Sequence, residues 1–286
     1  MKVLLAGAFG NLGTELMKAL SAKGCEIVAA DLFEKRVEGL EGKYRFVPID
    51  CTEPLSLRGI CDGCDTVIAA MSQTAASPRF DVCDIDLQGS LNLFEEAKRA
   101  GAAKFAFVSA LSCGMPGAET VPVLRAKKFV EDEIRQGGMD YCIFRPAPGF
   151  DETAGLFRSV AGKGKAKLLK DFGTVKANPI GCADLAAFIT AHLDETHVCY
   201  EVGGRETYTL EEMAKLCFEA CGKEAKIAYT PDWLYGLGAK LPGAKKSGRS
   251  AFIQSSQWNL SHDLVACDQT GEASFAEYIR KTFAAK

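Results

Sequence analysis

The segment Val3-Leu-Leu-Ala-Gly7-Ala-Phe-Gly10-Asn-Leu-Gly13-Thr14 decides the fold of this chain. An apolar run leads into three glycines spaced G-x-x-G-x-x-G. Apolar residues then recur at helical spacing up to Gly24, namely Leu12, Leu16, Ala19 and Leu20. A strand that turns through glycines directly into an amphipathic helix opens a βαβ unit. The segment therefore predicts the first strand and first helix of a parallel α/β sheet.

The first half of the chain repeats this alternation of apolar runs and helical periods. Most runs are apolar at successive positions, as expected for parallel strands that helices cover on both faces. The pattern predicts an α/β fold of the Rossmann type, with a doubly wound parallel sheet. The expected strands are Lys2–Ala6, Cys25–Ala30, Tyr44–Ile49, Thr66–Ala70, Lys104–Val108, Tyr141–Phe144 and Val198–Val202, and the expected helices are Asp84–Ala100, Val123–Gln136 and Ala183–Leu193.

The alternation loosens after Arg145-Pro146, which suggests two parts. Residues 1–150 are predicted to form a dinucleotide-binding Rossmann domain whose sheet is completed by 176–203. Residues 204–286, together with 151–175, are predicted to form a smaller substrate lobe.

Three features are expected within this smaller lobe. Gly162–Lys176 is rich in lysine and glycine, and such a run indicates a solvated loop. Thr209, followed three residues later by Glu212, predicts a capped helix that reaches about Ala220. The chain is expected to end in the helix Ser274–Phe283.

The composition limits the classes of partner. Of the 286 residues, 48% are hydrophobic and 25% are charged, which is ordinary for a globular protein with a sizeable core. The net charge of −3 provides no broad basic field, so neither nucleic acid nor a membrane surface is expected as a partner. No apolar run approaches the roughly 20 residues that span a bilayer, and Met1-Lys2 leads directly into a strand. We expect a cytoplasmic monomer or homodimer that acts on a small molecule.

The cysteines and histidines indicate neither disulfides nor a metal site. The twelve cysteines are irregularly spaced, and several fall within expected strands and helices, as small buried hydrophobes do. Cys61-Asp62-Gly63-Cys64 has no second CxxC and a turn-like centre, so we interpret it as structural. His192, His197 and His262 show no metal-ligand spacing, and no metal is expected.

The glycine spacing predicts a dinucleotide site. Gly7 permits the tight turn, Gly10 lets a pyrophosphate approach the backbone, and Gly13 lets the helix pack closely on the strand. The amides at the helix N-terminus are then directed at the phosphates.

The ends of the next strands carry the polar groups that such a site needs. Asp31 can accept hydrogen bonds from both ribose hydroxyls and repels a 2′-phosphate, which favours NAD. Lys35 and Arg36 could serve a 2′-phosphate if their loop folds back, so NADP is not excluded. Asp50 can reach the adenine amino group, and the small residues at 69–71 let the backbone pass beside the ribose.

With these residues placed, the chain resembles the atypical short-chain dehydrogenase/reductase group, near the NmrA-like and NAD-dependent epimerase-like families. The likeness covers about residues 1–225 and rests on the glycine loop and five further segments. These are Asp86–Gly101, Phe105–Ser109 and Phe144-Arg145-Pro146, together with Asn178–Ala186 and Gly203–Glu212, which look like the divinyl-reductase and complex I accessory-subunit branch.

The resemblance also implies site residues, and one of them is missing. Typical members carry Tyr-x-x-x-Lys and a nearby Ser or Thr. Lys127 matches the lysine, but Val123 stands where the tyrosine would be, and Ser109 follows strand five. Lys127 could orient the nicotinamide ribose, or it could be a solvated helix lysine paired with Glu131 at i+4. Lys127 and Ser109 are the candidate catalytic residues.

The remaining expectations concern the cofactor, the substrate and the reaction. Pro146–Phe150 should run beside the nicotinamide, and Phe150 or Trp258 is expected to stack on an apolar substrate. The expected cofactor-binding residues are Gly7, Phe9, Gly10, Asn11, Leu12, Gly13, Asp31, Asp50, Cys51, Ala69, Ala70, Met71, Lys127, Pro146 and Ala147.

Taken together, these features suggest an NAD(P)-dependent oxidoreductase that acts on a small apolar carbonyl or conjugated substrate. The alternative is a non-catalytic NAD(P)-binding sensor or assembly protein, which the missing tyrosine favours. An NAD-dependent epimerase is a weaker alternative, because such enzymes usually need the tyrosine as base.

Overall fold

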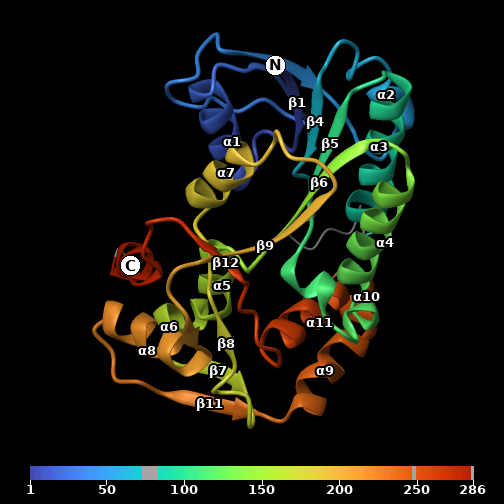
Figure 1. Ribbon diagram of the computed structural model, residues 1–286. Coiled ribbons are helices and arrows are strands. Elements are labelled where there is room, and N and C mark those ends of the chain that lie inside the picture. Colours follow the sequence, from blue (N-terminus) through green and yellow to red (C-terminus); the bar gives the residue numbers. More distant parts are fainter. Residues whose placement is uncertain (73–82, 247–248, 285–286) are drawn as a thin grey trace.

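The computed structural model describes residues 1–72, 83–246 and 249–284 (Figure 1). Its centre is an eight-stranded sheet in the order β12-β9-β6-β5-β4-β1-β2-β3, in which every neighbouring pair is parallel. The strands are β1 (Lys2–Ala6), β2 (Glu26–Asp31), β3 (Tyr44–Pro48), β4 (Thr66–Ala69), β5 (Lys104–Val108), β6 (Asp140–Pro146), β9 (Val198–Gly204) and β12 (Asp268–Thr270). The predicted Rossmann-type parallel sheet is confirmed.

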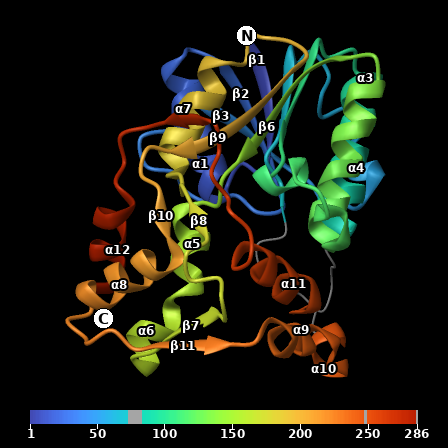
Figure 2. The ribbon, with the colours of Figure 1, turned by 60° about the horizontal axis from the view of Figure 1, so that its bottom comes forward.

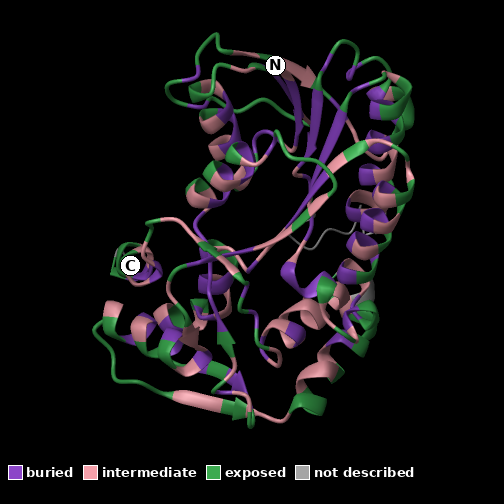
Figure 3. Cartoon of the chain, viewed as in Figure 1, coloured by how far each residue is buried: buried purple, intermediate pink, exposed green. Residues whose placement is uncertain are grey.

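Helices cover both faces of this sheet, and the inner strands β1, β4 and β5 are mostly buried, whereas the edge strands β3 and β12 are partly exposed (Figure 3). Alternate side chains of β1 enter two separate cores. Val3 and Leu5 pack with α1 (Asn11–Ala22) and α7 (Cys182–Ala191). Leu4 and Ala6 belong to the core that includes α3 (Ser90–Arg99) and α4 (Pro122–Gln136). Burial on both faces explains why the strands are apolar at successive positions.

A third core lies beyond the carboxyl ends of the strands and joins residues from 111 to 283. It combines helices and two small sheets, β8–β10 and β7–β11. The strands and helices of this part are α5 (Phe150–Leu156), α6 (Arg158–Lys163), β7 (Ala166–Leu169), β8 (Lys176–Ala177), β10 (Tyr208–Thr209), α8 (Leu210–Ala220), β11 (Ile227–Thr230), α9 (Asp232–Lys240), α10 (Pro242–Lys246), α11 (Arg249–Asn259) and α12 (Phe275–Ala284). Figure 2 shows α9, α10 and α11 at the end of the molecule opposite the N-terminus.

Some local predictions need correction. The interpretation of Gly162–Lys176 as a solvated loop is wrong, because β7 lies within it and pairs with β11. Lysines alternate there with buried apolar residues, a strand period that the high charge concealed. The expected helix Asp84–Ala100 begins instead as a π-helix, Cys83–Gly89, before α3. The capping box of Thr209 and Glu212 at the start of α8 is confirmed.

The glycine loop joins β1, β4 and α1 at very short range. Gly7 has φ +82°, and a Cβ there would lie 2.8 Å from the carbonyl oxygen of Ala70. A Cβ at Gly13 would lie 2.0 Å from the carbonyl oxygen of Gly7. At Gly10 an added Cβ would meet the Gly7 oxygen at 3.5 Å and no other atom within 4 Å. Packing therefore requires glycine at positions 7 and 13, whereas at position 10 it leaves the space open.

We predict that Gly13→Ala lowers the free energy of unfolding by about 1–3 kcal/mol, because backbone atoms must move to admit the methyl group. Gly10→Ala, the matched control, should stay within about 0.5 kcal/mol of the parent. Urea denaturation of the three proteins measures both values. Equal losses at the two positions would contradict this account of the loop.

Candidate functional site

The predicted cofactor residues gather at one edge of the sheet. The glycine loop follows β1, Asp31 ends β2, Asp50 follows β3, and residues 69–71 end β4. Pro146 and Ala147 close β6, two strands farther along. Open parallel sheets bind their ligands at the carboxyl ends of the strands.

The start of α1 fits a pyrophosphate. Gly10 is the N-cap of this helix, and no side chain caps it among the residues described. The first amides of a helix have no partner within the helix, so a bound anion can accept their hydrogen bonds. The open space at Gly10 lets such an anion approach the backbone directly.

Two opposite charges flank this loop. Oδ2 of Asp31 accepts a hydrogen bond from the backbone amide of Phe9 at 2.9 Å, which holds the carboxylate against the glycine turn. Nζ of Lys35 donates to the carbonyl oxygen of Phe9 at 3.1 Å, so the segment after β2 does fold back onto the loop. Arg36 instead pairs with Glu41 at 3.2 Å. The loop therefore presents a carboxylate suited to ribose hydroxyls and an ammonium suited to a phosphate.

Asp50 and Cys51 are held by local contacts. Oδ1 of Asp50 accepts hydrogen bonds from the amide of Thr52 at 3.1 Å and from its hydroxyl at 2.6 Å. The thiol of Cys51 packs so closely on Gly89 that a Cβ there would lie 2.6 Å from Sγ. Burial, with the charge of Asp50, raises the pKa of Cys51 to about 11, so the thiol remains neutral at physiological pH.

Lys127 is buried, with 6% of its surface exposed. Its Nζ lies 3.2 Å from Oδ1 of Asp86 and 3.3 Å from the carbonyl oxygen of Val108. Asp86, from the π-helix, also accepts a hydrogen bond from Ser72 at 2.6 Å. The alternative of a solvated lysine paired with Glu131 is wrong, because Glu131 has other partners.

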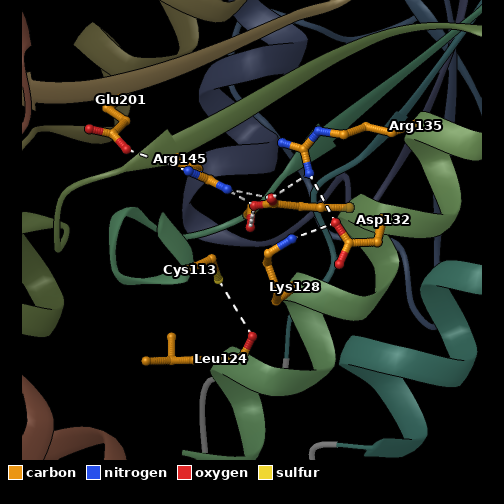
Figure 4. Close-up of polar contacts among 9 residues, drawn as sticks. Cys113, Leu124, Lys128, Asp132, Arg135, Arg145 and Glu201 are labelled. Atoms are coloured by element: carbon orange, nitrogen blue, oxygen red, sulfur yellow. Dashed lines mark hydrogen bonds and ion pairs between the residues drawn. The ribbon is translucent and has the colours of Figure 1, made fainter. Parts of the chain in front are cut away.

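Glu131 is fully buried at the centre of a charge network between α4 and β6. Its carboxylate accepts hydrogen bonds from Arg145 at 2.7 and 2.9 Å and from Arg135 at 3.0 Å, and Figure 4 shows these two arginines pointing toward each other. The hydroxyl of Ser109 donates to the same carboxylate at 2.6 Å. Burial by itself raises the pKa of Glu131, but Arg145 and Ser109 outweigh it and hold the pKa below its usual value. Ser109 thus directs its proton into this network.

The two expected substrate aromatics are both buried. Phe150 packs in the third core, with ring centroids 5.3 Å from Phe275 and 5.4 Å from Tyr278. Trp258 stacks on His262 at 3.7 Å, and its indole N–H has no partner among the described residues. Neither ring is brought to the open edge of the site in this structure.

The sequence reasoning missed Glu152, in the first turn of α5. Its Oε1 accepts a hydrogen bond from Nδ2 of Asn259 at 2.9 Å, and both residues line a cavity of about 10 Å³ together with Pro148 and Thr153. The residue as a whole is exposed, but protein atoms crowd its carboxyl group, and the resulting desolvation raises the pKa of this group. The charge of Lys127 acts in the opposite direction. No short sequence motif predicts this contact, because Asn259 lies 107 residues away from Glu152 in the chain.

A second missed contact links the cofactor loop to the third core. Nδ2 of Asn11 donates to Oδ2 of Asp151 at 2.7 Å, and the hydroxyl of Tyr278 donates to the other oxygen of that carboxylate. The start of α1 is thus tied to α5 and α12.

Other candidate chemistries have no support in the described part of the chain. Cys61 and Cys64 are buried, and burial raises the pKa of both thiols, that of Cys61 to about 12. Among the described residues, no three His, Cys, Asp or Glu side chains are grouped as a metal site would require. None of the described helices is both long and apolar enough to cross a membrane.

Comparison with known proteins identifies the family. The sequence profile of the NAD(P)H-binding family matches residues 7–196. The chain belongs to this family. It is 21% identical over 307 residues to the photosystem II assembly factor Ycf39 of Cyanophora paradoxa, a match that covers 99% of this chain and 92% of that one. It is 25% identical over 301 residues to the chloroplastic divinyl chlorophyllide a 8-vinyl-reductase of Oryza sativa subsp. indica, covering 95% and 73%.

A solved structure shares the fold of this chain. The NADPH-dependent quinone oxidoreductase of Escherichia coli, crystallised with NADPH, superposes with a TM-score of 0.76 at 17% identity, covering 98% of this chain and 99% of that one. The resemblance to atypical short-chain dehydrogenases/reductases is confirmed, and so is NAD(P) as the cofactor class.

We predict that Glu131→Gln costs about 1.5–3 kcal/mol of unfolding free energy at neutral pH, because Arg145 and Arg135 lose their charge-assisted hydrogen bonds and, among the described residues, Arg145 keeps only Glu201, at 3.5 Å, as a counter-charge. Exposed Glu133→Gln on the same helix is the control and should cost less than about 0.5 kcal/mol. Since the folded pKa of Glu131 is lowered, its contribution exists above the unfolded pKa and disappears as pH falls through the folded pKa. Urea unfolding at several pH values should therefore show the two proteins converging in acid; a constant difference contradicts the assignment.

Proposed function

We propose that this chain is an NAD(P)-dependent reductase for small apolar substrates with a carbonyl group or a conjugated double bond, and that Glu152 supplies the proton. The observation that carries the proposal is the Glu152 carboxyl. It lies just beyond the carboxyl end of β6, in a small cavity, and is held by Asn259 from another helix. Typical members of the family that the chain resembles carry a tyrosine where this chain has Val123, so the proton must come from another group.

The cofactor and Glu152 have separate roles in the proposed reaction. Bound NAD(P)H supplies the hydride to one carbon of the substrate. Glu152 donates its proton to the carbonyl oxygen, or to the neighbouring carbon of a conjugated alkene, and is left as a carboxylate. Because Glu152 as a whole is exposed, water can reprotonate it.

Lys127 has a positioning role in this proposal. An ammonium group has three donors, and Asp86 and the Val108 carbonyl engage two of them. Counting the described residues alone, this leaves a third donor for a hydroxyl of the nicotinamide ribose. The ion pair with Asp86 fixes where this donor points, which orients the cofactor without moving a proton.

A second function is favoured by one comparison. Several relatives are named as a photosystem II assembly factor, and a protein of that kind could use a bound dinucleotide as a structural or sensory ligand. The two functions separate in one experiment. Binding of NADH and NADPH is measured by fluorescence, and oxidation is then followed with quinones, enones and aldehydes as acceptors. Tight binding without oxidation by any acceptor overturns the reductase proposal and leaves the second function.

We predict that Glu152→Gln lowers turnover by about 10²–10⁴-fold, the usual contribution of a general acid. Glutamine keeps the oxygen that accepts from Asn259, so the fold should persist. Turnover by the parent should fall as pH rises through the raised pKa of Glu152, because the acid is then deprotonated. The variant should lose this limb of the pH profile and Glu152→Asp should keep one. An unchanged profile in Glu152→Gln excludes Glu152 as the acid.

We propose further that NAD(H) is preferred to NADP(H), and we predict opposite effects of the two charges beside Phe9. Asp31→Ala should shift the ratio of NADPH to NADH affinity upward by about tenfold, on the order of 1.4 kcal/mol, because repulsion of the 2′-phosphate is removed. Lys35→Ala should shift it downward. Arg36→Ala, which removes a charge engaged with Glu41, is the control and should change little. Titration of each protein with NADH and with NADPH measures the two affinities. Tighter binding of NADPH by the parent would contradict the proposed preference for NAD(H).

A further inference from the structure

Helix α9 packs small residues against the protein and exposes large apolar ones. Its small residues Gly236, Gly238 and Ala239 face α11: a Cβ at Gly236 would lie 3.0 Å from Gln257, and one at Gly238 would lie 3.7 Å from Ile253. Ala239 is buried. A helix on a globular protein normally buries its large apolar residues and exposes polar ones.

The outward face of α9 carries the large apolar residues instead. Trp233 is 69% exposed and Leu241, directly after the helix, is 61% exposed. Leu234 and Leu237 are also exposed and lie between them in sequence. We call Trp233, Leu234, Leu237 and Leu241 the α9 face. Clusters of this kind on one helix mark an interaction site more often than scattered single residues do.

Basic residues outnumber acidic ones in the segment that contains the α9 face. About one residue in eight of the whole chain is acidic, yet none of residues 233–262 is. The same stretch contains Lys240, Lys245, Lys246 and Arg249, and Lys240 and Arg249 are exposed. The nearest acid before it, Asp232, accepts a hydrogen bond from Gln257 at 2.7 Å. The net charge of −3 conceals this local asymmetry.

We propose that the α9 face docks on the surface of a lipid bilayer that contains anionic lipids. A tryptophan and three leucines on one face, followed by lysines and an arginine and with Asp232 engaged by Gln257, resemble the composition of a helix that lies in the membrane interface. Tryptophan suits the headgroup level, and each nearby cation adds attraction to an anionic surface. A protein partner would be expected to meet a border of mixed charge.

The position of α9 allows this docking. In Figures 1 and 2, α9 and α10 lie at the end of the molecule opposite the N-terminus, so a planar surface can approach them. Helix α11 packs behind α9 and carries Asn259, the partner of Glu152. The docked face is thus separated from the Glu152 cavity by a single helix. The inference itself does not depend on the proposed reaction.

Sedimentation of the full chain with vesicles tests the proposal. The protein should co-sediment with vesicles of phosphatidylcholine that contain phosphatidylglycerol, less with pure phosphatidylcholine, and less again as salt is added. The double variant Leu234→Asp/Leu237→Asp should lose at least tenfold in vesicle affinity. Leu55→Asp is the matched control, since Leu55 is 83% exposed in α2 (Pro54–Leu57), outside the face, and should bind as the parent does.

Tryptophan fluorescence gives a second readout. The chain has two tryptophans, of which Trp233 is exposed and Trp258 is buried. In Trp258→Phe, vesicles should shift the emission to the blue and brominated lipids should quench it, whereas Trp233→Phe should show neither effect. No co-sedimentation with anionic vesicles, or equal binding by the double aspartate variant, overturns the proposal. A concentration-dependent dimer that this variant abolishes, without vesicle binding, would show that a second copy covers the face instead.

Discussion

The contact between the backbone of α1 and the end of β1 is the constraint on which the site depends. With 2.0 Å between a notional Cβ at Gly13 and the oxygen of Gly7, any side chain there would push the helix away from the sheet. That displacement would move the helix N-terminus, and with it the amides that we expect to bind a pyrophosphate. It would also disturb Gly7, whose left-handed conformation keeps the turn against Ala70 of the neighbouring strand end. Cofactor affinity and stability therefore share one geometric cause.

Buried ion pairs connect the secondary-structure elements near this edge of the sheet. Glu131 ties α4 to β6 through Arg145, and Asp86 ties the π-helix to α4 through Lys127. Such pairs are costly to bury, so their value lies in fixing positions more than in adding stability. Here they set the direction of Ser109 and Lys127, the two candidate catalytic residues that the sequence suggested. Both residues therefore belong to a buried polar network, although Val123 occupies the expected tyrosine position.

The sequence was sufficient for features with a local signal. Continuous apolar runs predicted the parallel sheet, and the glycine spacing predicted the turn into α1. Distance along the chain explains what was missed. β7 is stabilised by β11, about sixty residues later, and the short β12 is defined by its pairing with β9. In the same way, the partner of Lys127 was sought one helical turn away, whereas the structure supplies Asp86 from another element. Glu152 became a candidate only through Asn259.

The strand order has a consequence for how the molecule is made. The chain leaves the sheet after β6, returns for β9, leaves again for α8 to α11, and returns once more for β12. Strand β12 (Asp268–Thr270) can pair with β9 only after more than 260 residues of this sequence have been synthesised. Contacts this distant in sequence slow folding, because a long loop must close before they form. We therefore expect the sheet and the third core to fold together. Cleavage of the chain at a single position between them would not release either part as an independently folded domain.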